Sequence, residues 1–150
     1  MTNYKGYNFL YHPKFKKEFN KILKQYKCPT LKEDFKLLYD ILTQHLQENN
    51  KFEAHMCMHI AGLDNRVVLP AFIIKKFRCE GINKGSNSGF RLTFIFDKEE
   101  DRFIFVEMYR KKTKKIPNKN RINELFKKNI IISEELYKDE ENFLNNFEEE

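Results

Sequence analysis

Residues 72–115 read FIIKKFRCEGINKGSNSGFRLTFIFDKEEDRFIFVEMYRKKTKK, and this stretch decides the fold. Three runs rich in β-branched and aromatic residues cover positions 71–79, 89–97 and 102–112, and two segments rich in Gly, Asn, Ser and Asp separate them. Runs of this kind, bounded by turn-forming residues, are typical of neighbouring antiparallel strands. The stretch therefore predicts a three-stranded β-meander.

Positive charge gathers at the ends of these predicted strands. Arg78 and Arg91 flank the glycine-rich connection, and Arg110, Lys111 and Lys112 end the third run. In an antiparallel pair, the end of the first strand lies near the start of the second. The sequence therefore predicts a cationic concavity on the sheet, suited to a phosphodiester because guanidinium binds two phosphate oxygens at once.

The second strand alternates between two kinds of side chain. Phe90, Leu92, Phe94 and Phe96 share one face, whereas Arg91, Thr93 and Ile95 share the other, because side chains alternate across a strand. We expect the aromatic face to be covered and Arg91 to lie on the open face. An ordinary exposed arginine remains the alternative to a functional one, since surface arginines are common. The third strand is apolar on both sides over residues 103–106, which is typical of a central strand.

Two amphipathic helices precede the meander. A short strand at residues 7–11 ends at His12-Pro13, and Pro is well tolerated at a first helical position. Apolar residues then recur with helical spacing in two segments, separated by Cys28-Pro29, and Thr30 with Glu33 forms a capping box for the second. We expect an α+β fold in which this strand and the helical hairpin of residues 13–48 pack on an antiparallel sheet of about four strands, with one or more further helices at the C-terminus. The stripes consist of Phe15, Phe19, Ile22, Leu23 and Tyr26, and of Leu31, Phe35, Leu38, Ile41, Leu42 and Leu46.

Residues 51–70 carry a pattern that could suggest a metal site. His55, Cys57 and His59 would share one face of an extended chain. A structural zinc site needs four ligands, and neither these residues nor Cys28 and Cys79 offer the required spacing. We therefore expect no metal, and a loop that leads into the sheet.

The chain divides by charge into a basic body and an acidic tail. It has 150 residues, enough for one domain, and a net charge of +6. Residues 134–150 hold eight acids against Lys138, a net charge of −7, so residues 1–133 carry +13. Four of the six arginines fall between residues 78 and 110. A basic body predicts a polyanionic partner such as nucleic acid, although the abundance of lysine also fits a general compositional bias.

The acidic tail has helical periodicity. Ser133 can cap a helix over residues 133–147, with Leu136, Phe143 and Leu144 among its apolar residues. Either it docks on the body and guards the basic surface, or it is a solvated tail. No apolar run is long enough for a signal peptide or a membrane span, so we expect a cytoplasmic protein without membrane contacts.

The order of these elements resembles the RelE/ParE superfamily of type II toxins. The specific part is KKFRC, then GxxKGSxSGFRLxF, then VEMYRKK, within residues 75–115, and the resemblance extends over residues 7–125. His59-Ile60-Ala61-Gly62 also resembles a short element before the meander in that family. The resemblance implies a toxin domain over residues 1–132, followed by an acidic tail over residues 133–150. Members of the superfamily are ribosome-dependent mRNA endoribonucleases, or poison gyrase, and are held inactive by a cognate antitoxin.

The resemblance also implies site residues. Arg91 matches the arginine that binds the scissile phosphate, Lys75 matches a basic residue of the first meander strand, and Lys111 and Lys112 match a basic pair after the last strand. A first-strand position that is basic in many members is Ile73 here. The catalytic residues expected are Lys75, Arg91, Lys111 and Lys112, and the RNA-binding residues expected are Lys76, Arg78, Lys84, Tyr109, Arg110, Lys114 and Lys115.

The chemistry implied is RNA cleavage without metal or cofactor. The 2′-hydroxyl attacks the adjacent phosphorus in line, so the protein must align the reacting atoms and stabilise charge on the phosphorane oxygens. A lysine acts as base only if neighbouring cations or burial depress its pKa. The expected partners are an antitoxin, mRNA and the ribosome. A toxin that binds gyrase, and an RNA-binding module without catalysis, are the alternatives.

Overall fold

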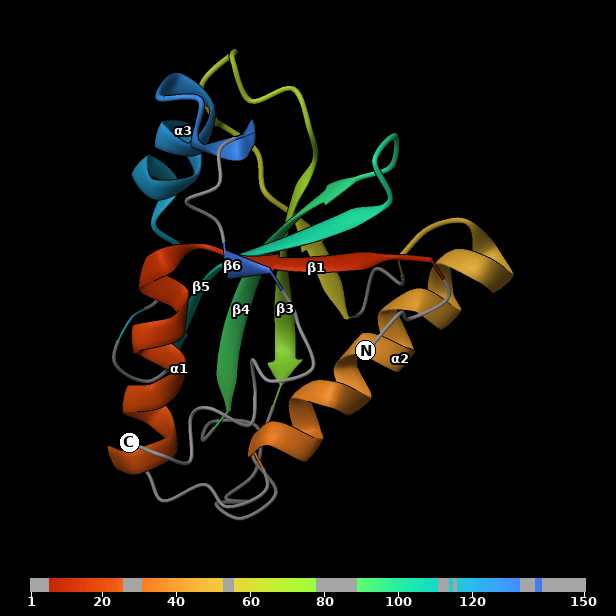
Figure 1. Cartoon of the computed structure of the whole chain (residues 1–150), viewed down its shortest axis with the longest axis vertical. Coiled ribbons are helices and arrows are strands. Elements are labelled where there is room, and N and C mark those ends of the chain that lie inside the picture. The colour runs from red at the N-terminus through yellow and green to blue at the C-terminus, as the bar shows by residue number, and fades with distance from the viewer. Residues whose placement is uncertain are drawn as a thin grey trace.

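The computed structural model describes residues 6–25, 31–52, 56–77, 89–110, 114, 116–132 and 137–138. Within these ranges the chain forms an α+β fold, with a six-stranded mixed sheet in the order β2-β3-β4-β5-β1-β6 (Figure 1). The elements are β1 (Asn8–Tyr11), α1 (Pro13–Gln25), α2 (Leu31–Asn49), β2 (Cys57–His59), β3 (Ala71–Phe77), β4 (Phe90–Asp97), β5 (Arg102–Arg110), α3 (Lys119–Lys127), a 3₁₀ turn (Ile130–Ile132) and β6 (Tyr137–Lys138).

The predicted meander is confirmed as β3, β4 and β5, which pair in antiparallel order. A polar turn connects β4 to β5. Asp97 accepts hydrogen bonds from the Glu100 backbone N–H at 3.2 Å and from Arg102 Nε at 2.9 Å, and Asp101 adopts a positive φ of 51°. Aspartate tolerates the left-handed conformation better than most residues. Arg102 therefore stabilises this turn, although the sequence grouped it with the arginines of the cationic surface.

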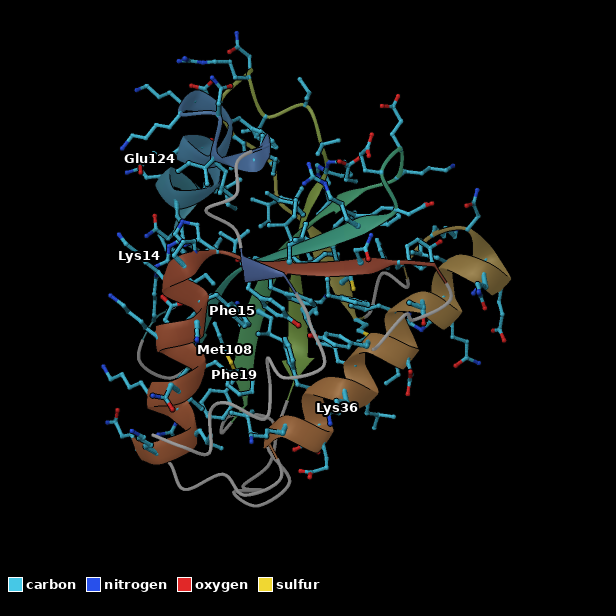
Figure 2. The ribbon with its side chains drawn as sticks, viewed as in Figure 1. Lys14, Phe15, Phe19, Lys36, Met108 and Glu124 are labelled. Carbon is cyan, nitrogen blue, oxygen red and sulfur yellow. The ribbon has the colours of Figure 1, made fainter. Side chains whose placement is uncertain are left out.

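The helical hairpin covers one face of the sheet, as the apolar stripes predicted. Phe15, Phe19, Phe35 and Leu38 belong to one buried cluster with the inward residues of β4, Phe90, Leu92, Phe94 and Phe96. Figure 2 shows Phe15 and Phe19 of α1 beside Met108 of β5. The stacking of rings continues into β1, where Phe9 lies between Tyr39 and Phe103, with centroid distances of 3.9 and 4.9 Å.

The opposite face of the sheet is not open, contrary to the prediction from β4. A second buried cluster joins Ile73, Ile95 and Ile104 of the sheet to Ile122 and Leu125 of α3. The segment between β2 and β3 adds further cover, and the Asp64 backbone N–H donates to Asn123 Oδ1 of α3 at 2.9 Å. The prediction failed because it considered only β4, whereas β5 is apolar on both faces and needs cover on both.

The sheet is also larger than predicted and is not wholly antiparallel. β1 runs parallel to β5, with Phe9 opposite Phe103 and Tyr11 opposite Phe105. β2 lies in the segment expected to be a loop and pairs antiparallel with β3. Both strands are short, three or four residues, so their alternation was too brief to indicate pairing.

The C-terminal segment differs from its prediction where it is described. Tyr137 and Lys138 form β6 and pair antiparallel with Tyr11 and Leu10 of β1. The expected helix over residues 133–147 is therefore wrong at these two positions, because pairing with the free edge of β1 satisfies backbone groups that a helix would satisfy internally. The remainder of the predicted helix lies outside the described residues.

Beyond Phe105, β5 extends past the end of β1, and an ion pair replaces the missing strand. Glu18 of α1 accepts a hydrogen bond from the Met108 backbone N–H at 3.1 Å. Arg121 of α3 donates to the Val106 carbonyl at 2.8 Å and to both Glu18 carboxylate oxygens, at 3.0 and 2.8 Å. This bracket occupies edge groups of β5 and joins α1 to α3.

Candidate functional site

Four polar side chains lie at adjacent positions on the α3 side of β4 and β5. Arg91 pairs with Tyr109 across the two strands, and Thr93 pairs with Glu107. Paired residues share a face of the sheet, and Ile95, two residues beyond Thr93, belongs to the cluster under α3. Ile73 of β3 is on this face as well, and Lys75 follows two residues later, where the pairing of β3 with β4 shifts register. We call Lys75, Arg91, Thr93, Glu107 and Tyr109 the polar strip.

An irregularity in β5 brings Glu107 into the strip. Thr93 pairs with Glu107 while Phe94 pairs with Phe105, so Val106 is an extra residue on β5. A bulge of this kind changes the direction of the side chains that follow. Glu107 is 3% exposed, and its carboxylate accepts the Asn118 backbone N–H at 2.8 Å and forms an ion pair with Lys114. Burial of the carboxylate is thus offset by a cation and a backbone donor.

Lys114 connects this ion pair to the tyrosine of the strip. Its Nζ lies 5.3 Å from the centroid of the Tyr109 ring, and its backbone N–H donates to the Arg110 carbonyl at 3.1 Å. The ammonium group therefore contacts a carboxylate and an aromatic face together. Lys114, predicted to bind RNA, has a structural role as the partner of Glu107.

Three polar atoms of the strip are buried without a hydrogen-bond partner in the described structure. These are Arg91 Nε, Thr93 Oγ1 and Tyr109 Oη. A buried polar atom that lacks a partner costs about 1–3 kcal/mol, so native proteins contain few of them. Here all three lie on neighbouring register positions of one face. A ligand group that accepts hydrogen bonds from all three would recover this free energy.

The charge state of the strip follows from its surroundings. Burial raises the pKa of Tyr109, and the Glu107 carboxylate raises it further, while the Arg91 guanidinium acts in the opposite direction. The phenol is therefore protonated at neutral pH and can donate a hydrogen bond. Arg91 lowers this pKa through its charge and through a side-chain interaction with the phenol, although Tyr109 Oη makes no hydrogen bond of good geometry. A permanent cation beside a neutral donor is a suitable arrangement for a phosphate oxygen.

The structure brings together only part of the predicted site. Lys75, Arg91 and Tyr109 lie in the strip, with Lys114 beside it. Arg110 pairs with Phe90, whose side chain belongs to the cluster under the helical hairpin, so Arg110 shares that face and not the face of Arg91. It lines a groove with Glu18, Lys21 and Gln25 of α1, and Tyr109 also borders this groove. For Lys76 only the backbone, in β3, is described. The predicted residues outside the described ranges are Arg78, Lys84, Lys111, Lys112 and Lys115.

Other chemistries find no support in the described part of the chain. Within it, no three His, Cys, Asp or Glu side chains lie together as metal ligands. Burial raises the pKa of the Cys57 thiol to about 12, so this cysteine is not a thiolate nucleophile. His59 contacts the Phe72 ring at 5.6 Å. None of the helices in the described ranges combines the length and the apolar character needed to cross a membrane.

Two residues of the strip were missed as site residues by sequence reasoning. Thr93 was predicted to share a face with Arg91. Threonine is common in strands, however, so its presence there does not indicate a functional site. Glu107 was visible as an isolated carboxylate in a run that is otherwise apolar, and this was a usable signal, because a buried carboxylate requires a partner.

Comparison with known proteins does not assign a relative. No family model matches the chain, and no curated protein and no solved structure matches it either.

Proposed function

We propose that the polar strip binds a phosphodiester of RNA, and that the protein is the toxin of a type II toxin–antitoxin pair which cleaves mRNA on the ribosome without a metal. The observation that carries the proposal is the set of three buried, unpartnered polar atoms on Arg91, Thr93 and Tyr109. The resemblance of residues 75–115 to the RelE/ParE superfamily supports the choice of RNA. Under this proposal the protein acts in the cytoplasm, and a cognate antitoxin holds it inactive.

The residues of the strip would divide the reaction between them. In the cleavage step the 2′-oxygen loses its proton to a base and forms a bond to phosphorus, while the bond from phosphorus to the 5′-oxygen breaks. The 5′-oxygen takes up a proton from water, so the products are a 2′,3′-cyclic phosphate and a 5′-hydroxyl. Arg91 would stabilise the charge on the phosphorane oxygens, and the neutral Tyr109 would donate a hydrogen bond to the same group. Lys75 is the candidate for accepting the 2′ proton. Glu107 is not, because Lys114 and the Asn118 backbone N–H already occupy its carboxylate.

The experiment compares matched arginine variants in a ribosome assay. Purified protein is incubated with ribosomes and mRNA, and the new 5′ ends are mapped. Arg91→Ala should lower the cleavage rate by about 100-fold or more, as expected when a donor to the transition state is removed. Arg66→Ala, at an exposed residue that pairs with Asp64, should retain the wild-type rate. If the wild-type protein produces cuts and Arg91→Ala produces them equally fast, Arg91 has no role in the reaction.

A second candidate function is RNA binding without cleavage. It is favoured by the engagement of Glu107, which leaves no unpaired carboxylate in the strip, and by Ile73 at a position that is basic in many family members. The same variants separate the two functions. RNA binding that depends on Arg91, without new 5′ ends, would select the binding module. DNA breaks that depend on gyrase, without RNA binding, would instead select gyrase as the target.

A further inference from the structure

A second polar hollow lies away from the polar strip, where the first turns of α1 and α3 meet. It has a volume of about 430 Å³. Figure 2 labels Lys14 and Glu124, which lie on the two sides of this hollow. Its polar lining consists of His12, Lys14, Asn118, Asn120, Arg121 and Glu124, all of which are described. We call it the helix-start cleft.

His12 provides the first evidence that the cleft receives a ligand. The imidazole is 9% exposed, and its Nδ1 accepts a hydrogen bond from the Lys14 backbone N–H at 3.0 Å. Because Nδ1 acts as the acceptor, the proton of the neutral ring must lie on Nε2. In the described structure Nε2 has no hydrogen-bond partner. A ring that is nine-tenths buried therefore lines the cleft with an unused N–H donor.

The electric potential at His12 provides the second evidence. The pKa of His12 is lowered to about 4, mainly by burial and then by the positive charges of Arg121 and Lys14, while Glu124 has the smaller, opposite effect. The cations thus outweigh the single acid of the cleft at the position of the imidazole. The start of α3 adds its positive dipole end, because the first backbone N–H groups of a helix point outward. The start of α1 adds less, because Pro13 has no N–H and the Lys14 and Phe15 N–H groups already bond to His12.

The charged residues around the cleft differ in how far other residues already engage them. Arg121 is occupied at Nη1 and Nη2 by Glu18 and the Val106 carbonyl, while its Nε is buried without a partner. Glu124 is half-exposed, and its Oε1 lies 3.6 Å from Nζ of Lys128, the residue that follows α3. The charge of Glu124 is therefore partly compensated. Lys14 is exposed and has no ion-pair partner among the described residues, so its ammonium group is available to a ligand.

We propose that the helix-start cleft binds a phosphate group. His12 Nε2 and the Lys14 ammonium group donate to its oxygens, and the start of α3 stabilises its charge. The phosphate belongs either to a free nucleotide or to a strand that crosses the protein. This site is separate from the polar strip and does not rest on the proposed function, although Asn118 lies next to both, since its backbone N–H donates to Glu107 and its side chain lines the cleft.

The test is a titration of ¹⁵N-labelled full-length protein with inorganic phosphate, adenosine 5′-monophosphate and a short RNA. Amide and imidazole signals of His12, Lys14 and Asn120 should shift and saturate, with a dissociation constant of about 1 mM for a free anion. Lys14→Gln should weaken binding by about fivefold or more, because a charge-assisted hydrogen bond is lost. Glu124→Gln should tighten it by about twofold, because a repulsive charge is removed.

The outcomes distinguish the sources of the phosphate and can overturn the proposal. Saturation by inorganic phosphate or the nucleotide assigns a free anion, whereas saturation by RNA alone assigns a strand phosphate. The proposed site is overturned if the signal shifts increase linearly with the concentration of all three ligands. It is also overturned if the dissociation constant is the same in the wild type, Lys14→Gln and Glu124→Gln. Arg91→Ala is the matched control, since it should leave the response of the cleft to inorganic phosphate unchanged even if it abolishes the activity of the strip.

Discussion

Acid should destabilise the protein through His12, at the start of α1. The imidazole keeps its proton off Nδ1 to accept the Lys14 backbone N–H, and burial together with Arg121 and Lys14 lowers its pKa from 6.5 to about 4. Between these two values the unfolded chain binds a proton that the folded chain excludes. The free energy of unfolding therefore falls as the pH falls through this window, and the contribution is fully present only above pH 6.5.

The magnitude follows from the size of the shift. A difference of one pKa unit corresponds to about 1.4 kcal/mol, so the full shift of His12 corresponds to about 3 kcal/mol. About 2 kcal/mol of this should be lost between about pH 7 and pH 4.5, where the folded imidazole is still largely neutral. For a domain whose total stability is typically about 5–15 kcal/mol, such a loss is readily measured by urea unfolding.

The comparison that isolates this effect uses His12→Asn. Asparagine is a preferred residue at the start of a helix and can accept the Lys14 backbone N–H, but it does not titrate. Carboxylates that protonate in the same range contribute to both proteins and cancel in the difference. The unfolding free energy of the wild type should therefore fall by about 2 kcal/mol more than that of the variant. Parallel pH curves for the two proteins would refute the argument, because they would mean that the folded imidazole titrates normally.

Two further substitutions test the bracket on β5 and the vacancy in the polar strip. Glu18→Gln should lower the unfolding free energy by about 2 kcal/mol, because it leaves the largely buried Arg121 without a counter-charge. Glu48→Gln, at an exposed residue, should change it by less than about 0.5 kcal/mol, and equal effects of the two substitutions in urea unfolding would contradict the role of the Glu18–Arg121 pair. Thr93→Val should raise stability by up to about 1 kcal/mol, because it removes a buried hydroxyl without a partner, and should weaken RNA binding in the same protein. The control is Thr43→Val, which should lower the unfolding free energy, because the Thr43 hydroxyl makes hydrogen bonds to two carbonyls of α2. If Thr93→Val also lowers the unfolding free energy, the Thr93 hydroxyl already has a hydrogen-bond partner.

The main elements could be predicted because their periodicity extends over many residues. The stripe of α1 and the stripe of α2 each continue for several turns, and the strands of the meander are seven to nine residues long. Patterns of this length predict both the element and the face that it buries. The burial of Phe15 and Phe35 in one cluster with the aromatic face of β4 followed from the same reasoning.

The strand predicted at residues 7–11 is confirmed as β1, but its pairing with β5 was not predicted. The strands β2 and β6 were not predicted, because the existence of such short strands depends on the partner. β1, β2 and β6 have two to four residues each, too few for a period, and each is defined by backbone pairing with a longer neighbour or with another short strand. The tail illustrates the competition: Leu136, Phe143 and Leu144 have helical spacing, but Tyr137 and Lys138 pair with the free edge of β1. A tertiary contact overrides local propensity there.

In the candidate site, Arg91 could be predicted from the sequence, whereas the position of Glu107 could not, because it depends on strand pairing. Arg91 could be found because a permanent cation in an amphipathic strand must lie on the polar face. The placement of Glu107 depends on the extra residue Val106 in β5, and the need for that bulge arises only when β4 and β5 pair. Alternation read without the bulge would turn Glu107 toward the helical hairpin, away from Arg91. The position of the one carboxylate in the strip is thus a property of the strand pair and not of either strand alone.

The bracket and the helix-start cleft share this dependence on distant residues. Arg121 lies outside the arginine-rich stretch and 103 positions from its partner Glu18, so the sequence did not indicate their pairing. In the structure this pair joins α3 to α1. The same guanidinium lowers the pKa of His12, so one residue sets the geometry of the β5 edge and the charge of the cleft. An arginine that is bonded to a carboxylate and a carbonyl by two of its nitrogens can still lower the pKa of a neighbouring group, although burial has the larger effect on His12. Arg121 can therefore have a structural role and affect ligand binding at the same time. Replacing Arg121 would alter the contact between α1 and α3 together with the charge of the cleft. Lys14 and Glu124 are the positions at which phosphate binding can be tested without changing that contact.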